Sequence, residues 1–229
     1  MLYCAHFAVV ERHQSVATET VPPARLITDT DTADGTTATA ITTAVNAAET
    51  RAAEDWIKMR TSKVTVLPYD AAWADDFEKI KCEIVGALGD LAEGVEHVGS
   101  TAVFGLSAKP CIDIDVVIAD YSTFDAVMAA LSDLGYFHEG DLGIAGREAF
   151  GYTDKPHLKK HHLYVCPRDS EELHRHITFR DFLRVNPDVA EEYGRVKTEA
   201  ARLYPDDIDG YIAHKSPIIE KIYRRCGLK

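Results

Sequence analysis

The chain has 229 residues, 46% of them hydrophobic and 27% charged, which is the balance of a globular protein long enough for one substantial core. It carries 37 acidic against 25 basic residues, and the formal net charge of -12 argues against non-specific nucleic-acid binding because it repels phosphate backbones. No stretch approaches the roughly 18 consecutive apolar residues that span a bilayer, and the first residues have no basic segment like that of a signal peptide. We therefore expect a cytoplasmic protein without a membrane partner.

The five cysteines are scattered along the chain and form no C-x-x-C pair. Their spacing predicts neither a disulfide framework nor a zinc site. Reduced structural thiols of an intracellular protein are the simplest interpretation. The five are Cys4, Cys82, Cys111, Cys166 and Cys226.

Residues 1–62 are expected to form an extension that precedes the main domain. The tract over residues 16–53 is rich in Thr and Ala and has few aromatic residues to anchor it, so we expect the extension to be largely disordered. Residues 38–59 contain enough alanine to form a helix. Its apolar face would consist of Val45, Ala48, Ala52, Trp56 and Met59.

A single domain is expected over residues 63–229, where apolar patterns become dense. Asp70 is a candidate N-cap, and the helix after it has an apolar stripe at helical spacing. Aromatic residues at similar spacing in the later helices are also assigned to the core. These core residues are Trp73, Phe77, Ile80, Ile84, Leu88, Phe179, Phe182, Tyr193 and Tyr204.

Strands and helices alternate through the middle of the domain. An extended segment at 95–98 leads through a Gly-Ser turn and a short helix near 101–106 into the apolar strand 111–119. A helix over 122–134 that ends at Gly135 is followed by a hairpin in the GDLGIAGREAF region, a strand over 161–165 and three helices from residue 170. This order predicts an α/β (α+β) fold, a mixed sheet flanked by helices with a C-terminal helical cap.

The candidate chemistry lies around the Gly-Ser turn. Gly99 allows a ligand to approach the backbone closely, and Ser100 with the free N–H groups of a helix start can bind a phosphate. Residues i and i+2 of a strand share a face, so Asp113 and Asp115 can together hold one divalent cation, with Ile112 and Ile114 buried behind them. Phosphates at a helix start and a metal beside them are what nucleotidyl transfer needs.

With these residues the chain resembles the GrpB family from about Val64 to the C-terminus. The resemblance rests on PYDAAWADDFE, EHVGSTAVFGLSAKPCIDIDV, HHLYV and RHITFRDFLRVNPDVAEEYGRVKTEAARLYPDD. It implies a nucleotidyltransferase-like fold, because the family is placed in that superfamily, and its domain also occurs fused to some dephospho-CoA kinases. The superfamily signature is a Gly-Gly or Gly-Ser turn followed by Asp-x-Asp on a strand.

The resemblance implies roles for particular residues. Asp113 and Asp115 are expected to bind Mg²⁺ and, with His162, to be catalytic. His176 and Arg180, one helical turn apart, are expected to contact a substrate phosphate together. The residues expected to bind substrate are Gly99, Ser100, Thr101, Lys109, Arg147, His176, Arg180 and Lys215.

Two positions depart from the family pattern. Phe104 stands where the family usually has proline. The strand HHLYV offers a histidine where polymerising enzymes of the superfamily supply a third carboxylate. Only one of His161 and His162 can face the site, and we favour His162 because it shares a face with Tyr164. Residues 157–162 are expected to concentrate positive charge opposite the aspartates.

Each motif also has a structural interpretation. The two aspartates can be solvated residues of an edge strand, the Gly-Ser pair an ordinary turn and N-cap, and residues 157–162 a solvated loop. His176 and Arg180 can be held in ion pairs with Asp181 or Glu172.

The leading hypothesis is a metal-dependent nucleotidyltransferase that takes a nucleoside triphosphate or another phosphorylated small molecule and acts on an unknown acceptor. The alternative is a non-catalytic module that binds a nucleotide or a CoA-related ligand, and a third is a purely structural interaction domain. No Walker A motif is present, so the chain does not resemble the kinase part of the fusion proteins.

Overall fold

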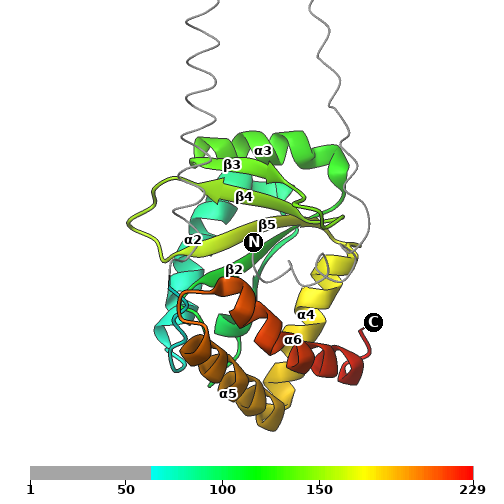
Figure 1. The fold of residues 1–229 in the computed structure, drawn as a ribbon. Coiled ribbons are helices and arrows are strands. Elements are labelled where there is room, and N and C mark those ends of the chain that lie inside the picture. The colour runs from blue at the N-terminus through cyan, green and yellow to red at the C-terminus, as the bar shows by residue number, and fades with distance from the viewer. Residues whose placement is uncertain (1–62, 229) are drawn as a thin grey trace, which may run out of the picture. The chain divides into compact units, whose positions relative to one another are not determined.

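A computed structural model of the protein describes residues 63–228, which form a mixed five-stranded sheet with helices packed against it (Figure 1). The strands are β1 (Gly94–Val98), β2 (Ile112–Ile118), β3 (Tyr136–Gly140), β4 (Glu148–Tyr152) and β5 (His161–Pro167), in the spatial order β1-β2-β5-β4-β3. β2 and β5 are parallel and the other neighbours are antiparallel. The predicted mixed sheet is confirmed, whereas the expectations for residues 1–62 lie outside the described residues.

One face of the sheet is covered by α2 (Ala72–Leu88) and α3 (Phe124–Asp133). The predicted stripe of α2 is confirmed, since all five of its members are buried in the main core with Ile112 and Ile114 of β2. Asp70 accepts a hydrogen bond from the Ala72 backbone N–H at 3.0 Å and so satisfies one of the free donors of the first turn. α3 ends at Asp133, one residue before its predicted end, and Gly135 just beyond it has a φ of 85°.

Three helices fill the C-terminal part, as predicted: α4 (Glu171–Val185), α5 (Pro187–Leu203) and α6 (Ile208–Arg225). In Figure 1 they gather at the β2 side of the sheet. α4 packs through Leu173 and Ile177 on Tyr164 and Cys166 of β5, which belong to the face away from α2. Helices α4, α5 and α6 share a second core around Tyr193.

The alternation of β2 places its two carboxylates between the sheet and α4. Ile112 and Ile114 are fully buried on the α2 face, while Asp113 and Asp115 point to the other face and are only 6% and 0% exposed. Asp115 is therefore not a solvated residue of an edge strand, because β2 is an interior strand and α4 covers this face.

The segment after the Gly-Ser turn differs from the expectation. Instead of a helix near 101–106, a single 3-10 turn, η2 (Ser100–Ala102), is followed by Val103 in an extended conformation and by Gly105 with a φ of 77°. A positive φ is incompatible with a right-handed helix, so the helix cannot continue. Phe104 is 85% exposed and its ring lies 5.1 Å from that of Tyr69.

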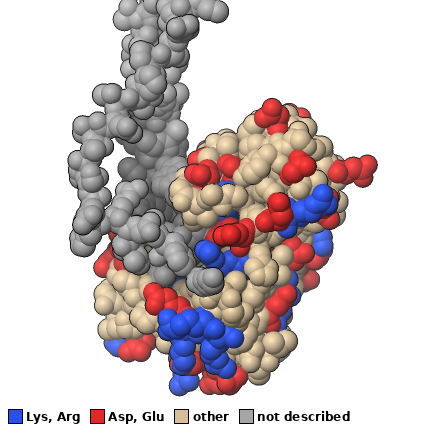
Figure 2. Space-filling view, turned by 90° about the vertical axis from the view of Figure 1, so that its right-hand side faces the viewer, with Lys and Arg blue, Asp and Glu red and all other residues tan. Residues whose placement is uncertain are grey.

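Charged side chains of both signs are interspersed over most of the face shown in Figure 2, and one group of Lys and Arg side chains lies near its lower edge. The net charge of the chain therefore does not produce a uniformly acidic surface there. Within residues 63–228, none of the helices combines the length and the apolar character needed to cross a bilayer.

Candidate functional site

The turn between β1 and η2 fits closely against β2. Gly99 has a φ of 70°, a backbone conformation that favours glycine. A Cβ placed on it would lie 2.9 Å from Asp113 Cβ and would collide with the Asp113 carboxylate. The absence of a side chain at position 99 thus gives Asp113 its place beside the turn.

Gly99→Ala is expected to destabilise the domain by at least about 3 kcal/mol, because it adds a collision with Asp113 to the cost of a positive φ. Gly105→Ala is the matched control, since Gly105 also has a positive φ but nothing within 4 Å of an added Cβ. It should cost only about 1–2 kcal/mol. Urea unfolding measures both, and equal losses would show that the contact with Asp113 is unimportant.

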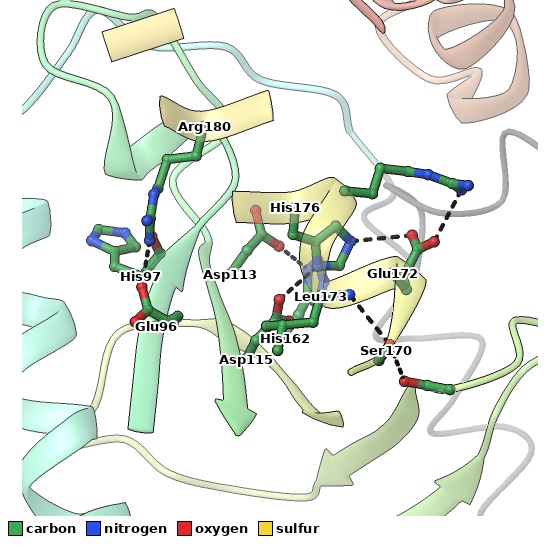
Figure 3. A network of polar contacts seen from close by, with 12 residues as sticks. Glu96, His97, Asp113, Asp115, His162, Ser170, Glu172, Leu173, His176 and Arg180 are labelled. Atoms are coloured by element: carbon green, nitrogen blue, oxygen red, sulfur yellow. Dashed lines mark hydrogen bonds and ion pairs between the residues drawn. The ribbon is translucent and has the colours of Figure 1, made fainter. Parts of the chain in front are cut away.

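Asp113 is held by a histidine of the neighbouring strand. His162 Nδ1 lies 2.8 Å from Asp113 Oδ1 (Figure 3). Burial lowers the pKa of His162 to about 4, so the imidazole is neutral near pH 7 and donates its Nδ1–H to the carboxylate. Burial is the largest single effect on Asp113 and would raise its pKa, but the hydrogen bond from His162 together with nearby positive charge outweighs it, so the pKa is lowered and Asp113 is ionised.

Asp115 is held in the same way by α4. His176 Nδ1 lies 2.7 Å from Asp115 Oδ2, and His176 Nε2 lies 3.3 Å from Glu172 Oε1 (Figure 3). The other oxygen of Asp115, Oδ1, is buried and accepts no hydrogen bond from any of residues 63–228. The two aspartates on one face of β2 are therefore each paired with a histidine, one from β5 and one from α4.

A pocket with an empty volume of about 550 Å³, including its opening to solvent, lies between the sheet and the helices. Val98, Gly99, Asp113 and Tyr164 line it from the sheet. The helices contribute a largely aromatic wall with two basic side chains, formed by Arg175, His176, Phe179, Tyr193, Ile219 and Tyr223. Of the predicted site residues, the structure thus brings Gly99, Asp113 and His176 together at one pocket.

Ser100 and Thr101 follow Gly99 in η2 and do not line this pocket. Both are buried: the Ser100 hydroxyl accepts a hydrogen bond from Lys197 Nζ at 2.8 Å, and Thr101 Oγ1 lies 3.0 Å from His97 Nε2. The His97 ring stacks on Phe77 at 4.6 Å, and burial lowers its pKa to about 4. These contacts hold the turn between β1 and η2 in its conformation.

Arg180 joins α4 to β1. Its guanidinium donates to Glu96 Oε2 at 2.6 Å and to the His97 carbonyl at 3.0 Å (Figure 3). It also donates to Asp181 Oδ1 at 2.8 Å. The ion-pair interpretation of Arg180 is confirmed by these contacts. The side chain positions the helix that carries His176.

Three further predicted residues lie close to the site without lining the pocket. Arg147 is fully buried, and its guanidinium lies 4.2 Å from the ring centre of Tyr164, which does line it. Lys215 is buried on α6, 5.0 Å from the ring centre of Tyr211. Burial lowers the pKa of Lys109.

The expectation that residues 157–162 concentrate positive charge opposite the aspartates is wrong for His157, Lys159 and His161. His157 bonds to Glu83 of α2 at 2.7 Å, and Lys159 lies 3.9 Å from Asp76 of the same helix. His161 points to the α2 face, where its Nε2 lies 2.7 Å from the Tyr136 hydroxyl. The alternation of β5 leaves His162 as the one histidine of this strand beside Asp113.

These carboxylate oxygens suit a hard divalent cation whose remaining ligands come from a bound substrate and water. Asp113 and Asp115 each have one oxygen bonded to histidine, and the unpaired Asp115 Oδ1 is a buried acceptor of the kind that a cation satisfies. Residues 63–228 contain no group of three or more His, Cys, Asp or Glu placed to hold a metal. Mg²⁺ is commonly bound by one or two carboxylates, with substrate phosphates and water completing its shell.

Lys197 and the aromatic wall were missed in the sequence as functional candidates. Lys197 carried a usable signal, because it falls in the apolar stripe of α5 with Val189, Tyr193 and Ala200, where a lysine is unexpected. Arg175 and Tyr223 carried none, since an arginine and a tyrosine on amphipathic helices are ordinary.

Relatives of known sequence and structure share this domain. UPF0157 protein YqkA of Bacillus subtilis is 33% identical over 161 residues, which are 69% of this chain and 46% of YqkA. A dephospho-CoA kinase of Mycolicibacterium paratuberculosis is 29% identical over 186 residues, 71% of this chain and 46% of the kinase. The chain thus matches about half the length of each of these two proteins.

A crystal structure of the conserved protein GrpB from Enterococcus faecalis has the same fold, with a TM-score of 0.64 and 34% identity over 71% of this chain and 96% of that chain. The GrpB protein family matches residues 63–225. This chain therefore belongs to the GrpB family.

Proposed function

We propose that the domain binds a nucleoside triphosphate in the pocket beside Gly99 and, with Mg²⁺ on Asp113 and Asp115, transfers a nucleotidyl group to an acceptor. One observation carries the proposal: two buried carboxylates share a face of β2, Asp115 has an oxygen without a hydrogen bond from residues 63–228, and Asp113 lies against a glycine turn and lines a pocket. The resemblance of this Gly-Ser and Asp-x-Asp arrangement to the nucleotidyltransferase signature also supports nucleotidyl transfer.

The wall of the pocket suits a ligand with a planar ring. Tyr164, Phe179, Tyr193 and Tyr223 line it, and aromatic side chains bind nucleobases by stacking. Arg175 lines the pocket beside them, and its guanidinium lies 6.0 Å from the Tyr223 ring centre. A cation next to an aromatic wall matches a ligand that joins a base to phosphates.

The residues around the aspartates prepare them for this role. Neutral His162 keeps Asp113 ionised and oriented, and His176 orients Asp115 while Arg180 fixes α4 against β1. Gly99 lets the Asp113 carboxylate lie against the turn, and both residues line the pocket that a phosphate would enter. When bound, Mg²⁺ would neutralise phosphate charge as the leaving group departs.

A second candidate is a non-catalytic module that binds a nucleotide or a CoA-related ligand. It is favoured by His162, which stands beside Asp113 where polymerising enzymes of the superfamily have a third carboxylate. The similarity to part of a dephospho-CoA kinase points to the same ligand class.

Thermal unfolding of the wild-type chain with a panel of nucleoside triphosphates and CoA precursors, with and without Mg²⁺, tests the proposal. A ligand at 100 times its Kd should raise the Tm by roughly 5–10 °C for a domain of this size. The variant Asp113→Asn/Asp115→Asn should lose this shift. Asp125→Asn/Asp133→Asn, which changes two exposed aspartates of α3, is the control and should keep it.

The outcomes separate the candidates. A Mg²⁺-dependent shift with one triphosphate, lost only in the site variant, supports the transferase and names its donor. A shift with a CoA precursor that needs no metal supports the binding module. A chain that shifts with none of these ligands would be a structural interaction domain, and both candidates would fail.

A further inference from the structure

The most unusual charged group of the domain is Lys197, which is not among the residues predicted to form the site. Its side chain is fully buried on α5, and Nζ donates to Ser100 Oγ of η2 at 2.8 Å. Nζ also lies 4.4 Å from the ring centre of Tyr193. Both neighbours adjoin the pocket, because Tyr193 lines it and Ser100 follows Gly99, which lines it too.

The surroundings of Lys197 do not neutralise an ammonium group. Within residues 63–228 no carboxylate forms an ion pair with it, and its hydrogen-bond partner is a neutral hydroxyl. Lys215 of α6 is buried nearby and repels a positive charge on Lys197, whereas Asp113 of β2 attracts one. Burial is the largest effect, and together with Lys215 it holds the pKa of Lys197 well below the lysine value of 10.5.

An anion in the pocket would change this balance. A phosphate group next to Gly99 and Tyr193 would lie on the other side of the wall that Lys197 touches. In a buried site, the interaction between two nearby charges is screened far less than at a surface. A negative ligand would therefore favour the protonated amine.

We propose that Lys197 is a charge-responsive positioning residue, which takes up a proton from solvent when an anionic ligand enters the pocket. The proton adds to the Nζ lone pair, and the resulting ammonium keeps its hydrogen bond to Ser100 and attracts the ligand through the turn. The role of Lys197 rests on the proposed function, because it requires that an anionic ligand binds in the pocket. Lys197 links ligand binding to proton uptake, so the affinity for the ligand should increase as the pH falls toward neutrality.

Calorimetric titration of the full chain with inorganic tripolyphosphate and Mg²⁺ at pH 8.5, in buffers of different ionisation enthalpy, tests the proposal. The slope of the binding enthalpy against buffer enthalpy gives the protons taken up. The wild type should take up more protons per ligand, by up to about one, than Lys197→Met or Lys197→Arg. Lys197→Arg should retain binding because its charge is permanent. Lys221→Met, at an exposed position of α6, should behave like the wild type.

The pH dependence of unfolding tests whether the pKa of Lys197 is lowered in the folded protein before any ligand binds. Because burial lowers the pKa of folded Lys197, its destabilising effect is fully present below that pKa and disappears as the pH approaches 10.5. The wild type should therefore gain stability relative to Lys197→Met between pH 7 and pH 10 in urea unfolding. A difference that stays constant with pH would overturn the proposal.

The titration separates this proposal from the proposed function. Tripolyphosphate that binds with equal proton uptake in the wild type and the Lys197 variants overturns the role of Lys197 and leaves the proposed function standing. If neither tripolyphosphate nor any triphosphate of the thermal panel binds, the proposed function fails, and the role of Lys197 fails with it.

Discussion

Asp113→Asn is expected to weaken Mg²⁺-dependent nucleotide binding by more than about 100-fold, since even residues that only support a metal ligand contribute about 10–100-fold to metal affinity. The substitution removes the negative charge but keeps the size of the side chain. An asparagine oxygen can still accept the hydrogen bond from neutral His162, so the unfolding free energy should change by only about 1 kcal/mol. Titration calorimetry and urea unfolding measure the two effects.

Asp133→Asn is the control for this prediction, because Asp133 is exposed at the end of α3 on the other face of the sheet. Unchanged affinity in Asp113→Asn would mean that Asp113 is not a metal ligand. A loss of several kcal/mol in unfolding free energy would instead assign it a structural role.

Trp73→Ala is expected to lower the unfolding free energy by about 4 kcal/mol, the largest loss that we predict for a single side chain. Trp73 is 1% exposed, lies in the main core on the buried face of α2 and meets the Tyr69 ring edge-on at 5.6 Å. Its removal leaves a cavity between the first helix and the sheet. A loss of this size is a large part of the stability of an ordinary domain.

Val85→Ala on the same helix is the matched comparison. Val85 is 44% exposed, so its truncation should change the unfolding free energy by no more than about 0.5 kcal/mol. Equal losses in the two variants would contradict the assignment of the buried face of α2.

The fold could be predicted where periodicity decides it. The stripe of α2 repeats every three or four residues, and all of its members are buried. The period of two along β2 put the isoleucines on one face and the aspartates on the other, and the same rule selected His162 over His161. The helix expected near 101–106 failed because the chain needs a positive φ at Gly105.

The contacts around the site could not be predicted, because they join residues far apart in the sequence. Arg180 bonds to Glu96 across 84 positions, and His157 bonds to Glu83 across 74. Charge alone made Arg180 a candidate for phosphate binding and placed His157 in the positive group expected opposite the aspartates. Their acidic partners are specified only by the packing of α4 on β1 and of the loop before β5 on α2.

The pocket itself depends on the same long-range packing. Tyr193 and Tyr223 line it from different helices, and Tyr164 lines it from β5. Each of these residues fits an ordinary core position in its own segment, and only the arrangement of the three helices on the sheet brings them together.

A crystal structure with a non-hydrolysable triphosphate and Mn²⁺ in place of Mg²⁺ tests the central claim most directly, because the anomalous signal of manganese locates the metal. The triphosphate used would be the one that stabilises the protein most. The account predicts a manganese ion within bonding distance of the carboxylates of Asp113 and Asp115, with the phosphates beside Gly99 and the base against the aromatic wall. A nucleotide bound outside this pocket, or a metal that contacts neither aspartate, would contradict it.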